Sequence, residues 1–166
     1  TESDAAYDHL FGSALADSSL HGRVVEIAGV RIAGLGGIFR GQVWAASGRP
    51  RYPSAKAFID QSGKGNRWRD GLPRKHRSSI FPDEYQTLLG KQADILVTHE
   101  APSCHPHGFQ AIDDLARQLG VQAVFHGHHH KQIDYGQDAI ERLSFVPWGV
   151  GYCGIQIGRA SWRERV

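Results

Sequence analysis

The chain has 166 residues, of which 40% are hydrophobic and 22% charged, with a formal net charge of +2. This length and mixture suit one ordinary globular domain, and the small net charge does not by itself mark a nucleic-acid binder. No run of residues approaches the roughly 20 apolar residues of a membrane span, so we expect no membrane partner. The chain has no signal-peptide pattern, and its two widely spaced cysteines exclude a disulfide framework. We therefore expect the protein to lie in a reducing cytoplasm.

The first part of the chain predicts a short helix followed by a β-hairpin. Residues 7–16 are weakly helical, and residues 23–37 read as two strands around a turn at Ala28-Gly29. Both halves of that stretch are rich in β-branched residues, which favour strands. The glycines that follow let the backbone turn tightly.

Residues 45–79 are polar, basic and interrupted by prolines and glycines, which predicts an insert that leaves the core. One short helix is expected near Ser54–Gln61. Residues 49–77 hold nine Lys or Arg against two Asp. Such a segment is usually a solvated loop, but it could also bind phosphate groups or track a nucleic-acid backbone. The candidate substrate contacts are Arg40, Arg74 and Arg77.

The second part predicts a βαβ unit. Residues 81–91 suit a helix opened by proline and closed by glycine. Residues 93–102 give a short strand that ends in polar residues, 109–120 give an amphipathic helix, and 121–130 give a second strand and loop. This order makes the two strands parallel neighbours. One or two closing strands are expected within 143–157.

Both strands of this unit end in histidine. His99 follows the first strand. Residues 126–130, of which four are histidines, follow the second. Ligands collect at the carboxyl ends of parallel strands, and imidazole is a common ligand for zinc, manganese and iron. Gly127 permits a sharp turn, after which an extended backbone would point His128 and His130 the same way. The sequence therefore predicts a metal site of His99, His128 and His130.

A third histidine-containing segment follows His99. Cys104, His105 and His107 lie in the sequence SCHPHG. They could form a second ligand set, but one cysteine and two histidines do not complete a tetrahedral site. We interpret the segment as a polar loop.

These motifs resemble the calcineurin-like metallophosphoesterases. Gly127-His128-His129-His130 matches the family's GHxH signature, and Thr98-His99 matches its isolated upstream histidine. The resemblance implies two divalent metal ions such as Mn, Fe or Zn, a phosphate-ester substrate, and shared binding of one ion by His99 and His128, with the partner ion on His130. It also implies an α/β fold of the four-layer sandwich type, with mixed β-sheets flanked by helices.

The chain departs from the family in lacking the upstream Asp-x-His, Gly-Asp and Gly-Asn-His-Asp/Glu motifs. We therefore expect residues 1–158 to be the carboxyl-side part of such a domain, giving a partial sandwich that is inactive alone and binds metal weakly. Residues 159–166 share no pattern with the rest and are interpreted as a tail of suspected non-native origin. Glu100 is expected to point away from His99. The acidic residues and histidine nearest the N-terminus, which are Asp4, Asp8 and His9, are interpreted as helix-surface residues.

Two other functions remain open from the sequence. The chain could be a basic, non-enzymatic module that binds phosphate or nucleic acid, with incidental histidines; salt-sensitive binding that survives loss of His128 and His130 would favour it. It could instead hold a single structural zinc on His99, the HGHHH loop and Cys104; collapse of thermal stability on chelation would favour that reading. The sequence does not indicate an oligomeric state.

Overall fold

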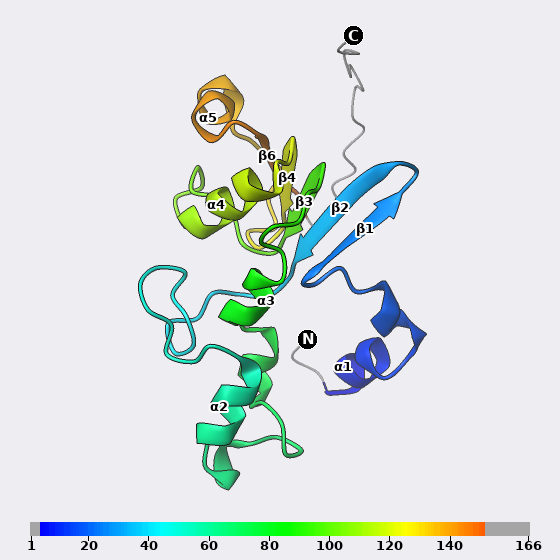
Figure 1. Ribbon diagram of the computed structural model, residues 1–166, viewed down its shortest axis with the longest axis vertical. Helices are drawn as coiled ribbons and strands as arrows, with labels where there is room; N and C mark the ends of the chain where they lie inside the picture. The colour runs from blue at the N-terminus through cyan, green and yellow to red at the C-terminus, as the bar shows by residue number, and fades with distance from the viewer. Residues whose placement is uncertain (1–3, 152–166) are drawn as a thin grey trace.

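Residues 4–151, which the computed structural model describes, form one mixed six-stranded sheet with helices beside it (Figure 1). The strands are β1 (Arg23–Ile27), β2 (Val30–Leu35), β3 (Ile95–Thr98), β4 (Ala123–His126), β5 (Ile133–Asp134) and β6 (Val146–Gly149). Their order across the sheet is β1-β2-β3-β4-β6-β5. The four inner strands are parallel, and the two edge strands β1 and β5 run antiparallel to their neighbours.

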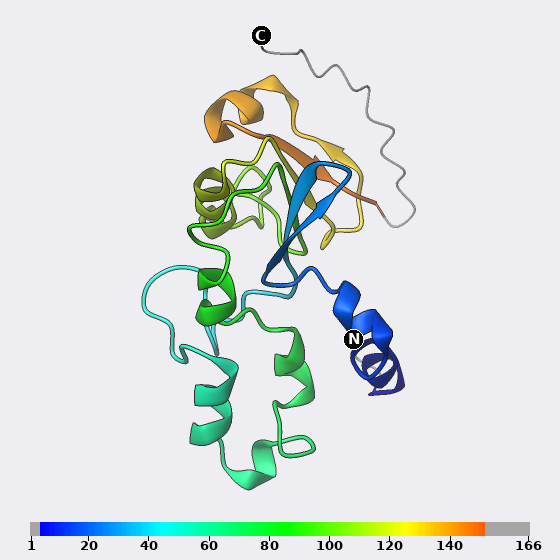
Figure 2. The same cartoon turned by 45° about the vertical axis from the view of Figure 1, so that its right-hand side comes forward.

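Helices α4 and α5 lie on one side of the sheet, whereas α2 lies far from it, on the segment that leaves after β2 (Figures 1 and 2). The α-helices are α1 (Asp4–Phe11), α2 (Ala55–Gln61), α3 (Pro82–Gln86), α4 (Gln110–Leu119) and α5 (Gly136–Leu143). The 3₁₀ turns are η1 (Ala14–Ser18), η2 (Lys64–Asn66) and η3 (Arg74–Ser78). Among the described residues, no helix is both long and apolar enough to cross a membrane.

The predicted βαβ unit is confirmed, and it builds the core. Helix α4 buries Ile112, Leu115 and Leu119 in the same cluster as Leu96 of β3 and Val124 of β4, all at most 1% exposed. Burying each such side chain stabilises the fold by about 1.5–3 kcal/mol. The α/β class is therefore confirmed, although residues 4–151 contain only one of the two sheets that a four-layer sandwich needs.

Most other predicted elements are present, with different lengths. The hairpin turns at Ala28 and Gly29, both at positive φ. Helix α2 begins after Ser54, whose side chain accepts a hydrogen bond from the Ala57 amide at 3.0 Å. The helix predicted over 81–91 is shorter, because α3 ends at Gln86 and turns follow. Strand β6 is one of the expected closing strands. The rest of the predicted 143–157 stretch, Cys153 and the 159–166 tail lie largely or wholly beyond residue 151, outside the described residues.

Gly120 closes α4 in the left-handed conformation, with φ 69°. An added Cβ would meet no atom within 4 Å, so Gly120→Ala changes only backbone strain. We expect a loss of about 1 kcal/mol in the free energy of unfolding, measured by urea denaturation. Gly63→Ala is the control, because Gly63 has φ −60° and equally open surroundings. A loss of equal size in both variants would contradict this account.

Candidate metal site at the strand ends

The candidate site begins where the parallel strands end together. Thr98 of β3 and His126 of β4 are register partners, and the adjacent strands end level with them. Just beyond, the His99 amide donates to the Leu35 carbonyl at 3.3 Å, and the His128 amide donates to the His99 carbonyl at 2.9 Å. Backbone hydrogen bonds therefore continue past the strands and hold both histidine segments side by side.

The rings of His99 and His128 meet at this edge. Their centroids are 4.6 Å apart and their planes are tilted by 41°. Burial lowers the pKa of His99, and the charges of His128 and His130 lower it further. A lowered pKa favours the neutral imidazole, which is the form that binds metal ions.

The loop after β4 is not extended, so that part of the prediction is wrong. The His130 amide donates to the Gly127 carbonyl at 3.1 Å, and His130 has a left-handed φ of 53°. His128 and His130 are therefore not placed on one side by strand alternation. His130 still lies close enough for its charge to act on His99. His129 turns to the SCHPHG loop, where it stacks on His105 with centroids 3.7 Å apart.

Glu100 was predicted to point away from the histidines, and the structure corrects this. Its side chain is 3% exposed. One carboxylate oxygen, Oε2, lies 2.9 Å from Nδ1 of His128, at ion-pair distance but off the line of an ideal hydrogen bond. The other oxygen accepts a hydrogen bond from the Phe39 amide at 3.1 Å. The backbone leaves the strand after Thr98, so the alternation of side chains no longer applies. Burial raises the pKa of Glu100, and His128 opposes that rise.

A second group of imidazoles lies behind the first. His126 is 2% exposed, and its Nε2 lies 2.8 Å from the Tyr135 hydroxyl, while its Nδ1 has no hydrogen-bond partner in the described part of the chain. Burial lowers the pKa of His126 to about 4. Cys104 packs against the core, and burial raises the pKa of its thiol to about 11. Because zinc binds the thiolate, this surrounding disfavours the structural zinc site that includes Cys104.

The donor set fits part of a metal centre. His99 and His128 present imidazoles at one edge, and the carboxylate of Glu100 stands behind His128, as carboxylates do behind metal-binding histidines. Within residues 4–151, however, no three His, Cys, Asp or Glu side chains converge closely enough to hold an ion. The described residues therefore bring two imidazoles and one carboxylate together at this edge, which is fewer donors than a complete metal site needs.

The candidate arginines have different surroundings. Arg40 and Arg74 line a cavity of about 680 Å³ that reaches His99, and Nη2 of Arg40 donates to Ser78 Oγ at 3.2 Å. The side chain of Arg77 is only 7% exposed and pairs with Asp4 at 2.9 Å. Arg77 thus holds α1 in place.

Asp4, Asp8 and His9 lie on α1 and none of them is buried, as predicted, but the two acids also tie the helix to the basic insert. Asp4 pairs with Arg74 at 2.5 Å as well as with Arg77. Asp8 pairs with Arg69 at 2.8 Å. These contacts join the start of the chain to the segment between β2 and α3.

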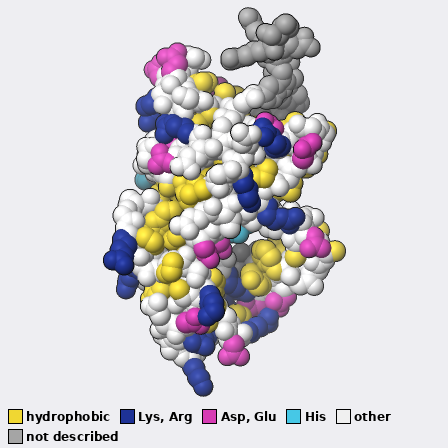
Figure 3. Space-filling model, viewed as in Figure 1, with side chains coloured by type: hydrophobic (Ala, Val, Ile, Leu, Met, Phe, Trp, Pro, Cys, Tyr) yellow, Lys and Arg dark blue, Asp and Glu magenta, His cyan; other side chains and the backbone are white. Residues whose placement is uncertain are grey.

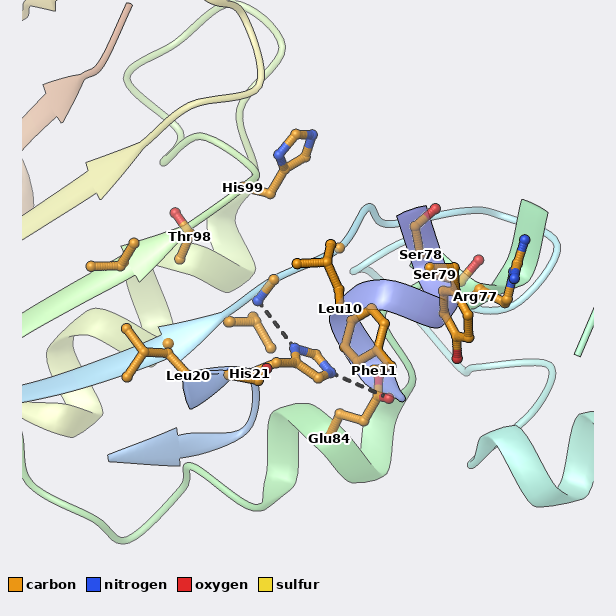
Figure 4. A pocket seen from close by; sticks show the side chains of 17 residues that line it. Leu10, Phe11, Leu20, His21, Arg77, Ser78, Ser79, Glu84, Thr98 and His99 are labelled. Atoms are coloured by element: carbon orange, nitrogen blue, oxygen red, sulfur yellow. Dashed lines mark hydrogen bonds and ion pairs between the residues drawn. The ribbon is translucent and has the colours of Figure 1, made fainter. Parts of the chain in front are cut away.

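A further cavity, of about 520 Å³, separates α1 from the sheet. Figure 3 shows hydrophobic side chains on both sides of this hollow, and Leu10 and Phe11 of α1 line it. In Figure 4 the His99 ring turns away from those two residues, while His21 joins the Gly36 amide to Glu84. The cavity is therefore mainly apolar, and it borders the histidine edge at Thr98 and His99.

The family model described as calcineurin-like phosphoesterase matches residues 17–132. An uncharacterized protein of Haemophilus influenzae (strain ATCC 51907 / DSM 11121 / KW20 / Rd) is 49% identical over 131 residues, which are 79% of this chain and 58% of that protein. The chain thus spans little more than half the length of this relative.

Proposed function

The chain belongs to the calcineurin-like phosphoesterase family, and we propose that its protein is a metal-dependent phosphoester hydrolase in which His99 and His128 bind one divalent ion and His130 binds a second. The observation that carries this proposal is the approach of the His99 and His128 rings, 4.6 Å apart, at the ends of adjacent parallel strands. Those two histidines come from separate segments that the backbone hydrogen bonds hold together. From the cysteine content alone, we propose that the protein lies in a reducing cytoplasm.

Divalent ions at such an edge would polarise phosphoryl oxygens and lower the pKa of a bound water. The residues of this chain have simpler tasks. Burial, and then the charges of His128 and His130, lower the pKa of His99, which favours the neutral ring whose nitrogen lone pair can bind an ion. Glu100 lies against Nδ1 of His128, which leaves Nε2 as the nitrogen of that ring for a metal ion. Arg40 lines the adjoining cavity, where it would hold the substrate's phosphate.

A dinuclear centre needs more donors than residues 4–151 bring together. A carboxylate suits the bridging position between the two ions, because its negative charge offsets the repulsion between two cations. We propose that this carboxylate and a proton-donating histidine belong to sequence outside this chain. The chain alone is then expected to bind a divalent ion weakly and to hydrolyse nothing.

Titration calorimetry with Mn²⁺ and with Zn²⁺ tests the ligand assignment. The chain is expected to bind metal, and His99→Ala and His128→Ala are each expected to abolish that binding. His107→Ala is the matched control, because His107 is an exposed histidine of the neighbouring loop. Unchanged metal binding in both ligand variants would refute the assignment.

Hydrolysis is tested separately in a longer polypeptide that covers the full length of the Haemophilus influenzae relative. It is expected to hydrolyse a generic phosphodiester or phosphomonoester in the presence of metal. The same two histidine substitutions should remove that activity, and His107→Ala should retain it. A longer protein that binds metal through these histidines but hydrolyses neither substrate would contradict the enzymatic proposal.

A further inference from the structure

The cavity beside His99 has an unusual lining. It encloses about 680 Å³, and its lining, as far as residues 4–151 form it, has three cationic side chains and no carboxylate. Lys and Arg are interspersed with Asp and Glu over the face shown in Figure 3, so overall charge does not single out this place. The lining residues are Gly37, Ile38, Arg40, Arg74, Lys75, Ser78 and His99.

Two of the cations are free to meet an anion. Arg40 donates a hydrogen bond from Nη2 to Ser78, but its buried Nε has no hydrogen-bond partner within residues 4–151. Lys75 is exposed, and no ion pair of its ammonium occurs among the described residues. Arg74 is partly neutralised by Asp4. A buried guanidinium donor without a partner costs free energy, which an entering phosphate oxygen would recover.

Two of these cations also act on one buried histidine, His76, which lies next to Lys75 in the chain. His76 is 4% exposed, and burial is the main cause that lowers its pKa. The charges of Lys75 and Arg40 lower it further. Both cations thus act on the same small volume, where their attraction for an anion adds.

The basic cavity adjoins another cavity that has aromatic side chains in its lining. A second cavity of about 750 Å³ shares Arg74 and Lys75 with the first and extends along Trp68 and Arg67. The guanidinium of Arg74 lies 4.0 Å from the centroid of the Trp68 ring. Cations that follow a chain of phosphates, joined to an aromatic surface that accepts bases, are the features of a single-strand nucleic-acid groove.

We propose that these two adjoining cavities bind a single strand of nucleic acid, with one phosphate on Arg40 and Lys75 and a base near Trp68. Since the first cavity reaches His99, the adjoining phosphate of that strand lies at the histidine edge. That this strand is the substrate rests on the proposed hydrolase function, whereas the binding of the strand does not. Binding itself requires no metal.

Fluorescence anisotropy with labelled oligodeoxynucleotides and oligoribonucleotides of about 12 nucleotides tests the groove, in chelator and at several salt concentrations. Binding by the chain is expected to weaken as salt rises. Lys75→Gln and Arg40→Gln should each weaken it and flatten the slope of log K against log salt by about 0.7. Which of the two oligonucleotides binds more tightly distinguishes DNA from RNA, and either supports the proposal. Failure of both to bind would overturn it.

Lys91→Gln is the matched control, because Lys91 is an exposed lysine just before the amino end of β3, and His99 follows its carboxyl end. It is expected to bind like the parent chain. An equal loss of oligonucleotide affinity in Lys91→Gln and Lys75→Gln would contradict the proposed groove, because overall charge alone would then explain the binding. Circular dichroism melts establish that the variants are folded.

Trp68→Ala separates a strand from a simple anion. It is expected to weaken oligonucleotide binding about 5- to 100-fold while leaving competition by inorganic phosphate unchanged. If the Trp68→Ala variant keeps the oligonucleotide affinity of the parent chain, the proposed binding of a strand is wrong and the cavity is only an anion site. Because all binding is measured in chelator, loss of metal binding or of hydrolysis would not affect this result, and a negative result here would leave the hydrolase proposal standing.

Discussion

Lowering the pH from about 7.5 to about 5 in the presence of a chelator is expected to destabilise the protein by about 2 kcal/mol through His126 alone. His126 is 2% exposed, and its pKa in the fold is about 4 because burial penalises the charged ring. The same ring in the unfolded chain has a pKa near 6.5. Urea denaturation at the two pH values measures the difference.

The sign follows from proton binding. Between about pH 6.5 and about pH 4 the unfolded chain carries a proton on His126 that the folded chain does not, so acid favours unfolding. The contribution is complete above about pH 6.5 and is lost as the pH falls toward 4. His99, His105 and His129 also have lowered pKa values, chiefly through burial, and act in the same direction.

His126→Gln removes the ring that takes up this proton and keeps a polar group opposite Tyr135. The variant is expected to lose about 2 kcal/mol less stability than the parent over the same pH range. His9→Gln is the control, because His9 lies exposed on α1, and it should follow the parent. A His126→Gln variant with the parent's pH dependence would show that burial of this ring does not set the acid sensitivity.

The sequence predicted the parts of the fold that hydrophobic periodicity determines. The apolar stripe of α4 and the short β-branched runs on either side require two parallel strands, and these strands place His99 beside the loop that contains His128. The edge strand β5 and helix α5 were not predicted. Strand β5 has only two residues, and a pattern of that length carries no periodic signal.

The details of the site depend on backbone outside regular elements, where periodicity does not apply. The prediction for Glu100 continued the alternation of β3 one residue too far, and the prediction for His130 assumed an extended loop. The contacts of Asp4 with Arg74 and Arg77 join residues about 70 positions apart. No local pattern indicates such a pairing, so only the three-dimensional structure could show it.

Glu100→Gln is expected to lower the affinity of the chain for a divalent ion about 10- to 100-fold, measured by titration calorimetry. The carboxylate lies 2.9 Å from Nδ1 of His128, where it fixes the ring and makes the other nitrogen a better ligand. Glutamine keeps an acceptor for the Phe39 amide, so the fold should be retained. Glu100→Ala would leave that amide unpaired and cost a further 1–3 kcal/mol or so of stability.

The matched control for this loss is Glu84→Gln. Glu84 also joins a histidine, at 3.3 Å from Nε2 of His21, and also accepts a backbone hydrogen bond, from the Phe81 amide at 2.7 Å. It therefore repeats the contacts of Glu100 around a histidine that is not a proposed ligand. If Glu100 acts by positioning His128, only Glu100→Gln weakens metal binding. Equal affinities in the two variants would mean that the carboxylate behind His128 serves the fold alone, and that the metal ion depends on the imidazoles without its help.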